Sequence, residues 1–195
     1  VRMEAARAGA VIVGEDLGNI PRGLRGALDA SGILGCRLQL FERKDDTTFA
    51  PPETFDRTAI ASFSTHDLPT WQGWRKGREI EARRDLGHIS PDFAAGELDR
   101  RKDEVAGFDA MTAPHRPEGT APESADAMHH ALAETRSALA LVQIECVLGI
   151  EAQPNLPGTV DEYPNWRRRL PLAPKDIADE PRLARAAAIM RAHDR

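Results

Sequence analysis

Two cysteines, no long apolar run and no excess of positive charge characterise this sequence of 195 residues. Cys36 and Cys146 lie far apart and lack the short spacing of metal-binding cysteines, which argues against a cysteine-held metal site. Both stand among apolar residues. We therefore expect buried free thiols on core strands.

The sequence has no run of about 18 apolar residues, so we expect no membrane span. Its first residues, VRMEAARAGA, lack the long apolar segment of a signal peptide, which makes the cytoplasm the expected compartment. The net charge is −5 and no basic stripe is present, which argues against nucleic acid as a main partner. Hydrophobic residues make up 41% and charged residues 29%, as in a globular domain or a piece of a larger one.

Short apolar runs predict four strands, at residues 11–14, 36–41, 58–63 and 139–144. These runs are nearly continuous rather than alternating, which favours parallel strands covered on both faces. Apolar residues at helical spacing, with proline or serine at the starts, predict helices over 21–31, 69–86, 91–107, 124–137 and 181–195. Residues 112–123 hold three prolines and a glycine and predict an exposed loop. The order predicts an α/β fold with about half the strands of an eight-stranded barrel.

Functional groups of α/β folds gather where the chain leaves the carboxyl ends of the strands. The first strand ends at Glu15 and Asp16, the third is followed by His66 and Asp67, and the fourth ends at Glu145. Glycosidic bond chemistry needs a proton donor to the leaving oxygen and negative charge near an oxocarbenium-like centre. Two carboxylates at the ends of different strands, with a histidine beside one, suit this reaction.

Structural roles compete for the same residues. Asp16 is placed to cap the helix that follows it, and Asp67 precedes a proline and can form an Asx turn. Glu15 can face solvent, and His66 can be a core histidine. Trp71 and Trp74 lie three apart on a predicted helix, where they serve either as packing or as a sugar platform. The remaining histidines near the helices and loops are expected on the solvated surface: His88, His115, His129 and His130.

Three segments together resemble the 4-α-glucanotransferases, also called amylomaltases, of glycoside hydrolase family 77. The segments read VIVGEDLGNIPRGLRGALDASGILGCRLQLFER, FSTHDLPTWQGW and NLPGTVDEYPNWRRRLP, and they occur in the family's order. The resemblance extends from about residue 8 to residue 171. It implies that residues 1–195 are the carboxy-terminal part of a catalytic TIM barrel, strands five to eight. Residues 88–135 would form a helical insertion that contains the Pro-rich loop 112–123.

The resemblance also implies site residues. Glu15, in GEDLG, would be the general acid/base, and Asp67, in THD, would bind sugar hydroxyls and stabilise the transition state. His66 would contact the donor sugar. Asn155 would border the cleft with its loop residues Pro157 and Gly158. The implied reaction moves α-1,4-glucan segments between maltodextrins by a retaining double displacement, without a metal or organic cofactor.

One element of the family pattern is missing from the sequence. The nucleophilic aspartate belongs to an earlier strand, in an arginine-x-aspartate-histidine context that does not occur here. Asp16 cannot replace it, because neighbouring side chains on a strand point to opposite faces. We therefore expect these 195 residues alone to be inactive and poorly folded, with open sheet edges.

Three functional hypotheses follow. The first is a 4-α-glucanotransferase that is catalytic when complete. The second is a glucan-binding module or degenerate half-barrel without turnover. The third is a hydrolase of α-glucans, against which the NLPGT and PNWRR segments speak.

Overall fold

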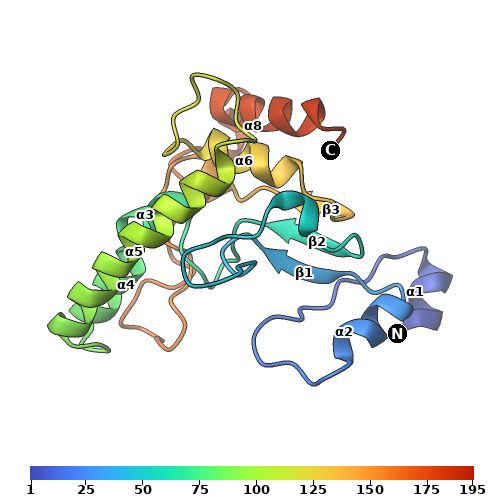
Figure 1. Ribbon diagram of the computed structural model, residues 1–195, viewed down its shortest axis with the longest axis horizontal. Helices are drawn as coiled ribbons and strands as arrows, with labels where there is room; N and C mark the ends of the chain where they lie inside the picture. Colours follow the sequence, from blue (N-terminus) through green and yellow to red (C-terminus); the bar gives the residue numbers. More distant parts are fainter.

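The computed structural model describes residues 1–195 as an α/β protein with one small parallel sheet (Figure 1). The strands are β1 (Gly35–Leu38), β2 (Ala59–Ser62) and β3 (Leu139–Leu141). The helices are α1 (Arg2–Ala8), α2 (Leu24–Ala30), α3 (Trp71–Lys76), α4 (Arg78–Asp85), α5 (Pro91–Thr112), α6 (Ala125–Ala133), α7 (Ile144–Val147) and α8 (Pro181–Ala192). Two 3-10 turns, η1 (Pro52–Thr54) and η2 (Pro174–Asp176), complete the order.

The sheet has the order β1-β2-β3, and all its pairs are parallel. Gly35 pairs with Ala59, and Ile60 pairs with Leu139, so the strands run in chain order. Figure 1 shows α5, α6 and α8 on one side of the sheet and α2 beyond the edge at β1. This arrangement confirms the predicted α/β class with parallel strands, and its strand order is that of part of a TIM barrel.

The predicted strand at 11–14 is reduced to a single parallel bridge between Val13 and Leu34. The prediction of a buried strand is wrong here, because Val11 is 70% exposed and Val13 is 43% exposed. The segment has one neighbour, the chain at Leu34, and its other side is uncovered. A strand with one partner gains half the ladder bonds and half the burial of an internal strand.

The fourth predicted strand, residues 139–144, is twice as long as the observed strand β3. It ends at Leu141, and α7 begins at Ile144, so Cys146 lies on a helix rather than on a core strand. Leu139 and Leu141 are about half exposed because no further strand lies beside β3 in this chain. Cys36 lies on β1 as predicted, and both thiols are free and buried. Burial raises the pKa of Cys146 to about 12.

The predicted helices all form, with changed bounds. The helix expected over 69–86 is divided into α3 and α4 at Gly77, whose φ of 67° is left-handed. Thr70 caps α3 and Ser90 caps α5 through side-chain hydrogen bonds to Gly73 and Phe93. Helix α5 runs five residues beyond the predicted end, to Thr112, because Gly107 is accommodated inside it. The loop predicted at 112–123 joins α5 to α6.

The main core lies between the sheet and the helices α3 and α5. Trp71, Trp74 and Phe108 are at most 2% exposed and pack in contact with Phe63 and Phe49. The rings of Phe63 and Trp71 lie 5.3 Å apart with their planes at 85°, an edge-to-face contact. Trp71 and Trp74 therefore serve as packing, and the alternative of a sugar platform is wrong for them.

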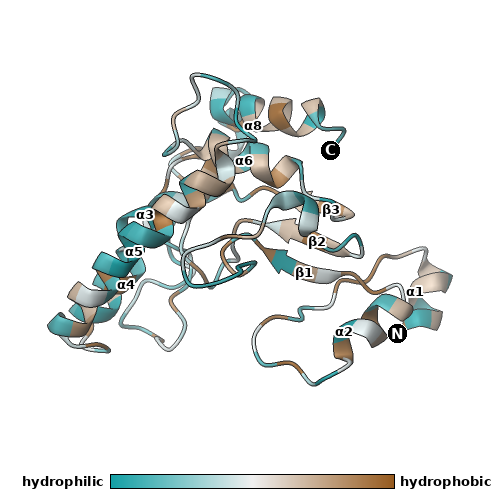
Figure 2. Ribbon diagram, in the orientation of Figure 1, coloured by the Kyte–Doolittle hydropathy of each residue, from teal (hydrophilic) through white to brown (hydrophobic).

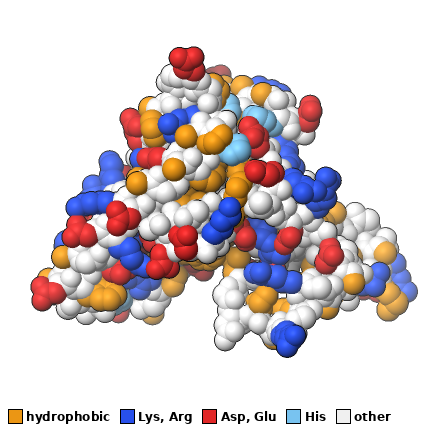
Figure 3. Space-filling model, viewed as in Figure 1, with side chains coloured by type: hydrophobic (Ala, Val, Ile, Leu, Met, Phe, Trp, Pro, Cys, Tyr) orange, Lys and Arg blue, Asp and Glu red, His pale blue; other side chains and the backbone are white.

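The surface is mixed in polarity and charge. Figure 2 shows hydrophilic residues along α4 and α5, and paler or hydrophobic residues on β2 and β3. On the face drawn in Figure 3, Lys and Arg side chains are interspersed with Asp and Glu, as the small net charge predicts. No helix is long and apolar enough to cross a membrane.

Candidate active site

The carboxyl end of β2 is held in place by hydrogen bonds. The Ser62 hydroxyl donates to the carbonyl of Ser64 at 2.8 Å, and the Ser64 hydroxyl lies 2.8 Å from the Gln143 side-chain oxygen. The backbone N–H of Asp67 donates to the Thr65 hydroxyl at 3.3 Å. These contacts fix the segment that carries the predicted pair of His66 and Asp67.

The structure brings three predicted site residues together. The Nδ2 of Asn155 donates to Oδ1 of Asp67 at 2.6 Å, and Nε2 of His66 lies 3.4 Å from the same oxygen. The backbone N–H of Asn155 also donates to the carbonyl of His66 at 3.3 Å. The buried side chain of Gln153 donates to the Asn155 carbonyl at 2.6 Å and to the Asp67 carbonyl at 3.4 Å. It thereby joins the segment of Asn155 to the segment of Asp67.

Two structural alternatives for this pair are excluded by the contacts. The Asp67 carboxylate bonds to Asn155 rather than to its own backbone, so it forms no Asx turn. The His66 side chain is 57% exposed and is not a core histidine. Both side chains are therefore accessible from solvent while their backbone is fixed, as a binding group requires.

The predicted loop residues Pro157 and Gly158 lie at an exposed turn. Gly158 has a φ of 88°, which a residue with a side chain rarely adopts. The carbonyl of Pro157 accepts a 3.4 Å hydrogen bond from Arg83 of α4. The turn is thus directed to α4, and it does not line the large cavity described next.

A cavity of about 940 Å³ lies over the sheet face opposite the helices. Its floor comes from the alternate strand residues that face away from the helix layer, and its rim comes from loops at the carboxyl ends of the strands. The lining residues are Cys36, Leu38, Ile60, Ser62, Ser64, Thr65, His66, Leu141, Gln143, Glu145, Ile150, Ala152, Pro154, Trp166, Arg168, Arg169, Leu170 and Pro171. Apolar walls with a few polar groups at one end are typical of ligand sites.

Sequence reasoning missed the aromatic member of this rim. The rings of Trp166 and His66 lie 5.1 Å apart, and both line the cavity. The signal was present in the sequence, because Trp166 is the aromatic residue of the PNWRR segment. Spacing along the chain does not show that this residue lies beside His66.

Glu15 makes no contact with the other predicted site residues. Its side chain is exposed and makes no hydrogen bond or ion pair, and no such contact joins it to Asp67. Its negative charge nevertheless acts on Cys36, a residue of the cavity floor. Burial first, then the negative charges of Asp16 and Glu15, raises the pKa of the Cys36 thiol, which lines the cavity.

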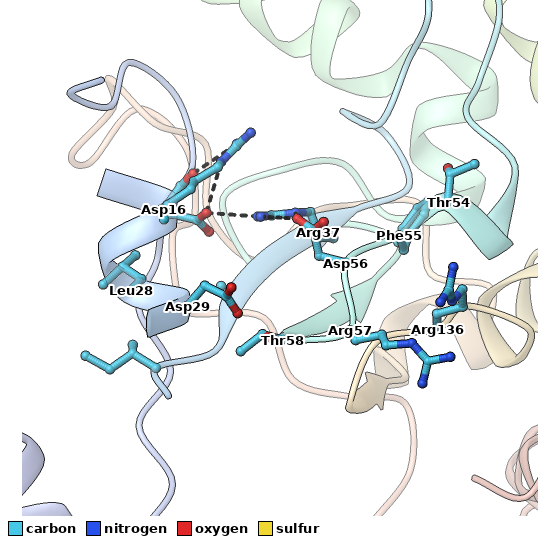
Figure 4. A pocket seen from close by; sticks show the side chains of 14 residues that line it. Asp16, Leu28, Asp29, Arg37, Thr54, Phe55, Asp56, Arg57, Thr58 and Arg136 are labelled. Atoms are coloured by element: carbon cyan, nitrogen blue, oxygen red, sulfur yellow. Dashed lines mark hydrogen bonds and ion pairs between the residues drawn. The ribbon is translucent and has the colours of Figure 1, made fainter. Parts of the chain in front are cut away.

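Asp16 has a structural role, but not the predicted one. Gly23, not Asp16, is the N-cap of α2, and no side chain caps that end. The Asp16 carboxylate is buried and accepts a hydrogen bond from the Cys36 N–H at 2.7 Å. It also accepts one from Nη1 of Arg37 at 2.9 Å (Figure 4). Arg25 of α2 donates to it at 3.1 Å. Burial alone would raise the pKa of Asp16, but these donors hold it below its usual range.

This ion-pair network borders a second cavity of about 470 Å³, outside the sheet (Figure 4). Arg37 also donates to Asp56 at 2.6 and 2.8 Å, so Arg37 joins the segment after Gly14 to the segment before β2. Gly35 leaves room beside it, since a Cβ there would lie 3.0 Å from Asp16 Oδ1, a tight contact. The network therefore positions the backbone that carries Glu15.

Two of the four histidines expected on the surface are enclosed. His129 is 1% exposed, and burial lowers its pKa to about 4. The prediction is wrong for His129, which lies on the buried part of α6, the helix on which α8 packs. His115 is largely buried and pairs with Glu134 at 2.6 Å. His88 is exposed as predicted.

Comparison with known proteins gives one family. Residues 1–173 match the sequence profile described as 4-alpha-glucanotransferase. The chain is 34% identical to a 4-alpha-glucanotransferase of Mycobacterium tuberculosis (strain ATCC 25618 / H37Rv) over 98% of its own length and 28% of the relative's. It is 32% identical to the Haemophilus influenzae enzyme of the same name, over 88% of this chain and 26% of the relative. The chain thus spans about a quarter of the length of these relatives.

Two solved structures share the fold. The amylomaltase from Corynebacterium glutamicum superposes with a TM-score of 0.82 at 28% identity, over 97% of this chain and 30% of that one. The amylomaltase from Streptococcus agalactiae, solved in complex with acarbose, gives a TM-score of 0.64 at 20% identity. This second likeness covers 98% of the chain and 33% of the solved structure.

Proposed function

The chain belongs to the 4-α-glucanotransferase family, and from this premise we propose that it acts as part of an enzyme that transfers α-1,4-glucan segments. The donor would be a maltodextrin, and the acceptor would be another maltodextrin or glucose. The observation that carries the proposal is the 2.6 Å hydrogen bond between Asn155 and Asp67, with His66 beside them. It supports a preorganised sugar-binding site at the carboxyl end of β2.

The proposed roles are those that membership of the family implies for these residues. A carboxylate from outside residues 1–195 attacks the anomeric carbon, and the bond from that carbon to the leaving oxygen breaks. Glu15 gives its proton to that oxygen. It then takes the proton of the acceptor's 4-hydroxyl, which attacks the same carbon and displaces the carboxylate. Asp67 accepts hydrogen bonds from sugar hydroxyls, Asn155 orients Asp67, and His66 contacts the donor sugar.

The test uses the longest reading frame that encodes this chain. We expect its product to convert maltotriose into glucose and longer maltodextrins, which separates transfer from hydrolysis because hydrolysis yields only shorter sugars. Glu15→Gln should abolish transfer, since an amide cannot exchange the proton, whereas the exposed Glu118→Gln should be neutral. An active Glu15→Gln variant would refute the role of Glu15. The 195-residue chain alone should show no transfer, because it lacks the nucleophile.

A glucan-binding module without turnover is the second candidate. It is supported by one observation: His66, Asp67 and Asn155 are assembled into an arrangement that can bind a sugar whether or not turnover follows. Calorimetric titration of the same reading-frame product with maltoheptaose separates the two candidates. Binding together with transfer supports the enzyme, and binding without any transfer supports the module.

A further inference from the structure

Trp166 differs from the other two tryptophans in its surroundings. Trp166 is 64% exposed to solvent, whereas Trp71 and Trp74 are buried in the core. It lies on the irregular segment that follows the loop of Asn155, and it lines the large cavity. A wide aromatic ring is therefore presented to solvent at the rim of the candidate site.

The backbone of Trp166 is held in an unusual conformation. Its φ of 59° is left-handed, and Asp194 is the one other non-glycine residue with positive φ. For a bulky residue this conformation is strained, and it persists only when the surroundings impose it. The N–H of Trp166 donates to the carbonyl of Pro154 at 3.0 Å, which closes the loop on itself.

The preceding residue completes this support. The Asn165 side chain accepts a hydrogen bond from the N–H of Leu156 at 2.9 Å and donates to the Thr159 hydroxyl at 2.8 Å. Leu156 is buried, so the loop is anchored in the protein. Strained residues held by such anchors are concentrated at binding sites.

We infer that the indole of Trp166 is a stacking platform for one glucosyl ring of a maltodextrin. The inference rests on the proposed function and adds a binding residue to it. A pyranose ring has an apolar C–H face and a rim of hydroxyls. The indole would cover the C–H face, while His66, whose ring lies 5.1 Å from that of Trp166, would meet the hydroxyls. His66 and Trp166 both line the cavity, so one sugar could contact both rings.

The experiment compares maltoheptaose binding among variants of the reading-frame product, by calorimetry. Trp166→Ala should weaken binding about tenfold, and Trp166→Phe, which keeps a flat ring, should recover most of the loss. Phe93→Ala is the matched control, because Phe93 is an exposed aromatic residue on α5, outside the cavity. It should leave the affinity unchanged.

Tryptophan fluorescence gives a second readout that does not depend on turnover. Maltoheptaose should reduce acrylamide quenching of the wild-type protein, and this protection should be smaller in Trp166→Phe. Equal affinity and equal protection in wild type and Trp166→Ala would overturn the inference while leaving the proposed function in place. Absence of maltoheptaose binding by the wild type would overturn the proposed function itself, and the inference with it.

Discussion

The side-chain amide of Asn155 donates a 2.6 Å hydrogen bond to the carboxylate of Asp67 across 88 positions of the sequence. One residue follows β2, and the other begins a loop after α7. The bond leaves the second carboxylate oxygen of Asp67 available, because no other side chain donates to it. It also fixes the direction in which that oxygen points, and a binding carboxylate must be held in this way.

Asn155→Ala should therefore lower kcat/KM for maltotriose transfer by about tenfold or more, since a hydrogen bond to a charged group is lost. The measurement is steady-state transfer by the reading-frame product, for Asn155→Ala, Asp67→Ala and the double variant. If Asn155 acts through Asp67, its removal has little further effect once Asp67 is gone. Full additivity of the two losses would contradict this positioning role.

Asp16→Asn should lower the free energy of unfolding at pH 7 by about 2 kcal/mol, because the buried Arg37 loses one of its charged partners. The amide still accepts from the Cys36 N–H, and Arg37 keeps Asp56, which limits the loss. Urea denaturation measures it. Asp29→Asn on α2 borders the same cavity without an ion pair and should be neutral.

The stabilisation from Asp16 has a defined pH dependence. Its pKa is lower in the folded protein than in the unfolded chain, so the unfolded chain binds more protons at acid pH. The contribution is complete above about pH 4 and is lost as the pH falls through the folded pKa. Asp16→Asn should lack this part of the acid sensitivity, and an unchanged acid profile would contradict the assignment.

His129 should make the protein less stable between about pH 6.5 and pH 4. Burial lowers its pKa from 6.5 to about 4, so in this range the unfolded chain takes up a proton that the folded protein does not. The free energy of unfolding should fall by about 3 kcal/mol as the pH drops through this window, and the fall should level off below it. Denaturation of His129→Leu should show a flatter profile, whereas the exposed His88→Gln should follow the wild type.

Two glycines of α5 should respond in opposite ways to alanine. A Cβ on Gly107 would lie 1.8 Å from the carbonyl oxygen of Thr47, so Gly107→Ala should cost about 1–3 kcal/mol. Gly96 has open space around it, so Gly96→Ala should stabilise the helix by up to about 1 kcal/mol. Thermal unfolding of both variants checks the pair, and a stabilised Gly107→Ala would disprove the close approach.

Local signals in the sequence predicted most of the elements. Serine and proline at helix starts predicted where α5 and α8 begin, because capping is decided by a few neighbouring residues. The strands were predicted less well. Residues 11–14 and 142–144 are apolar enough for strands, but strand formation depends on a partner that the sequence does not specify locally.

The site divides in the same way. The order of three motifs in the sequence by itself indicated the family and singled out His66, Asp67 and Asn155, because these residues lie within the motifs. Only the tertiary structure decided that these three side chains meet, that Asp16 binds Arg37 instead of capping α2, and that Trp166 lies beside His66. Each of these contacts joins segments that folding brings together, and spacing along a chain carries no record of such distances.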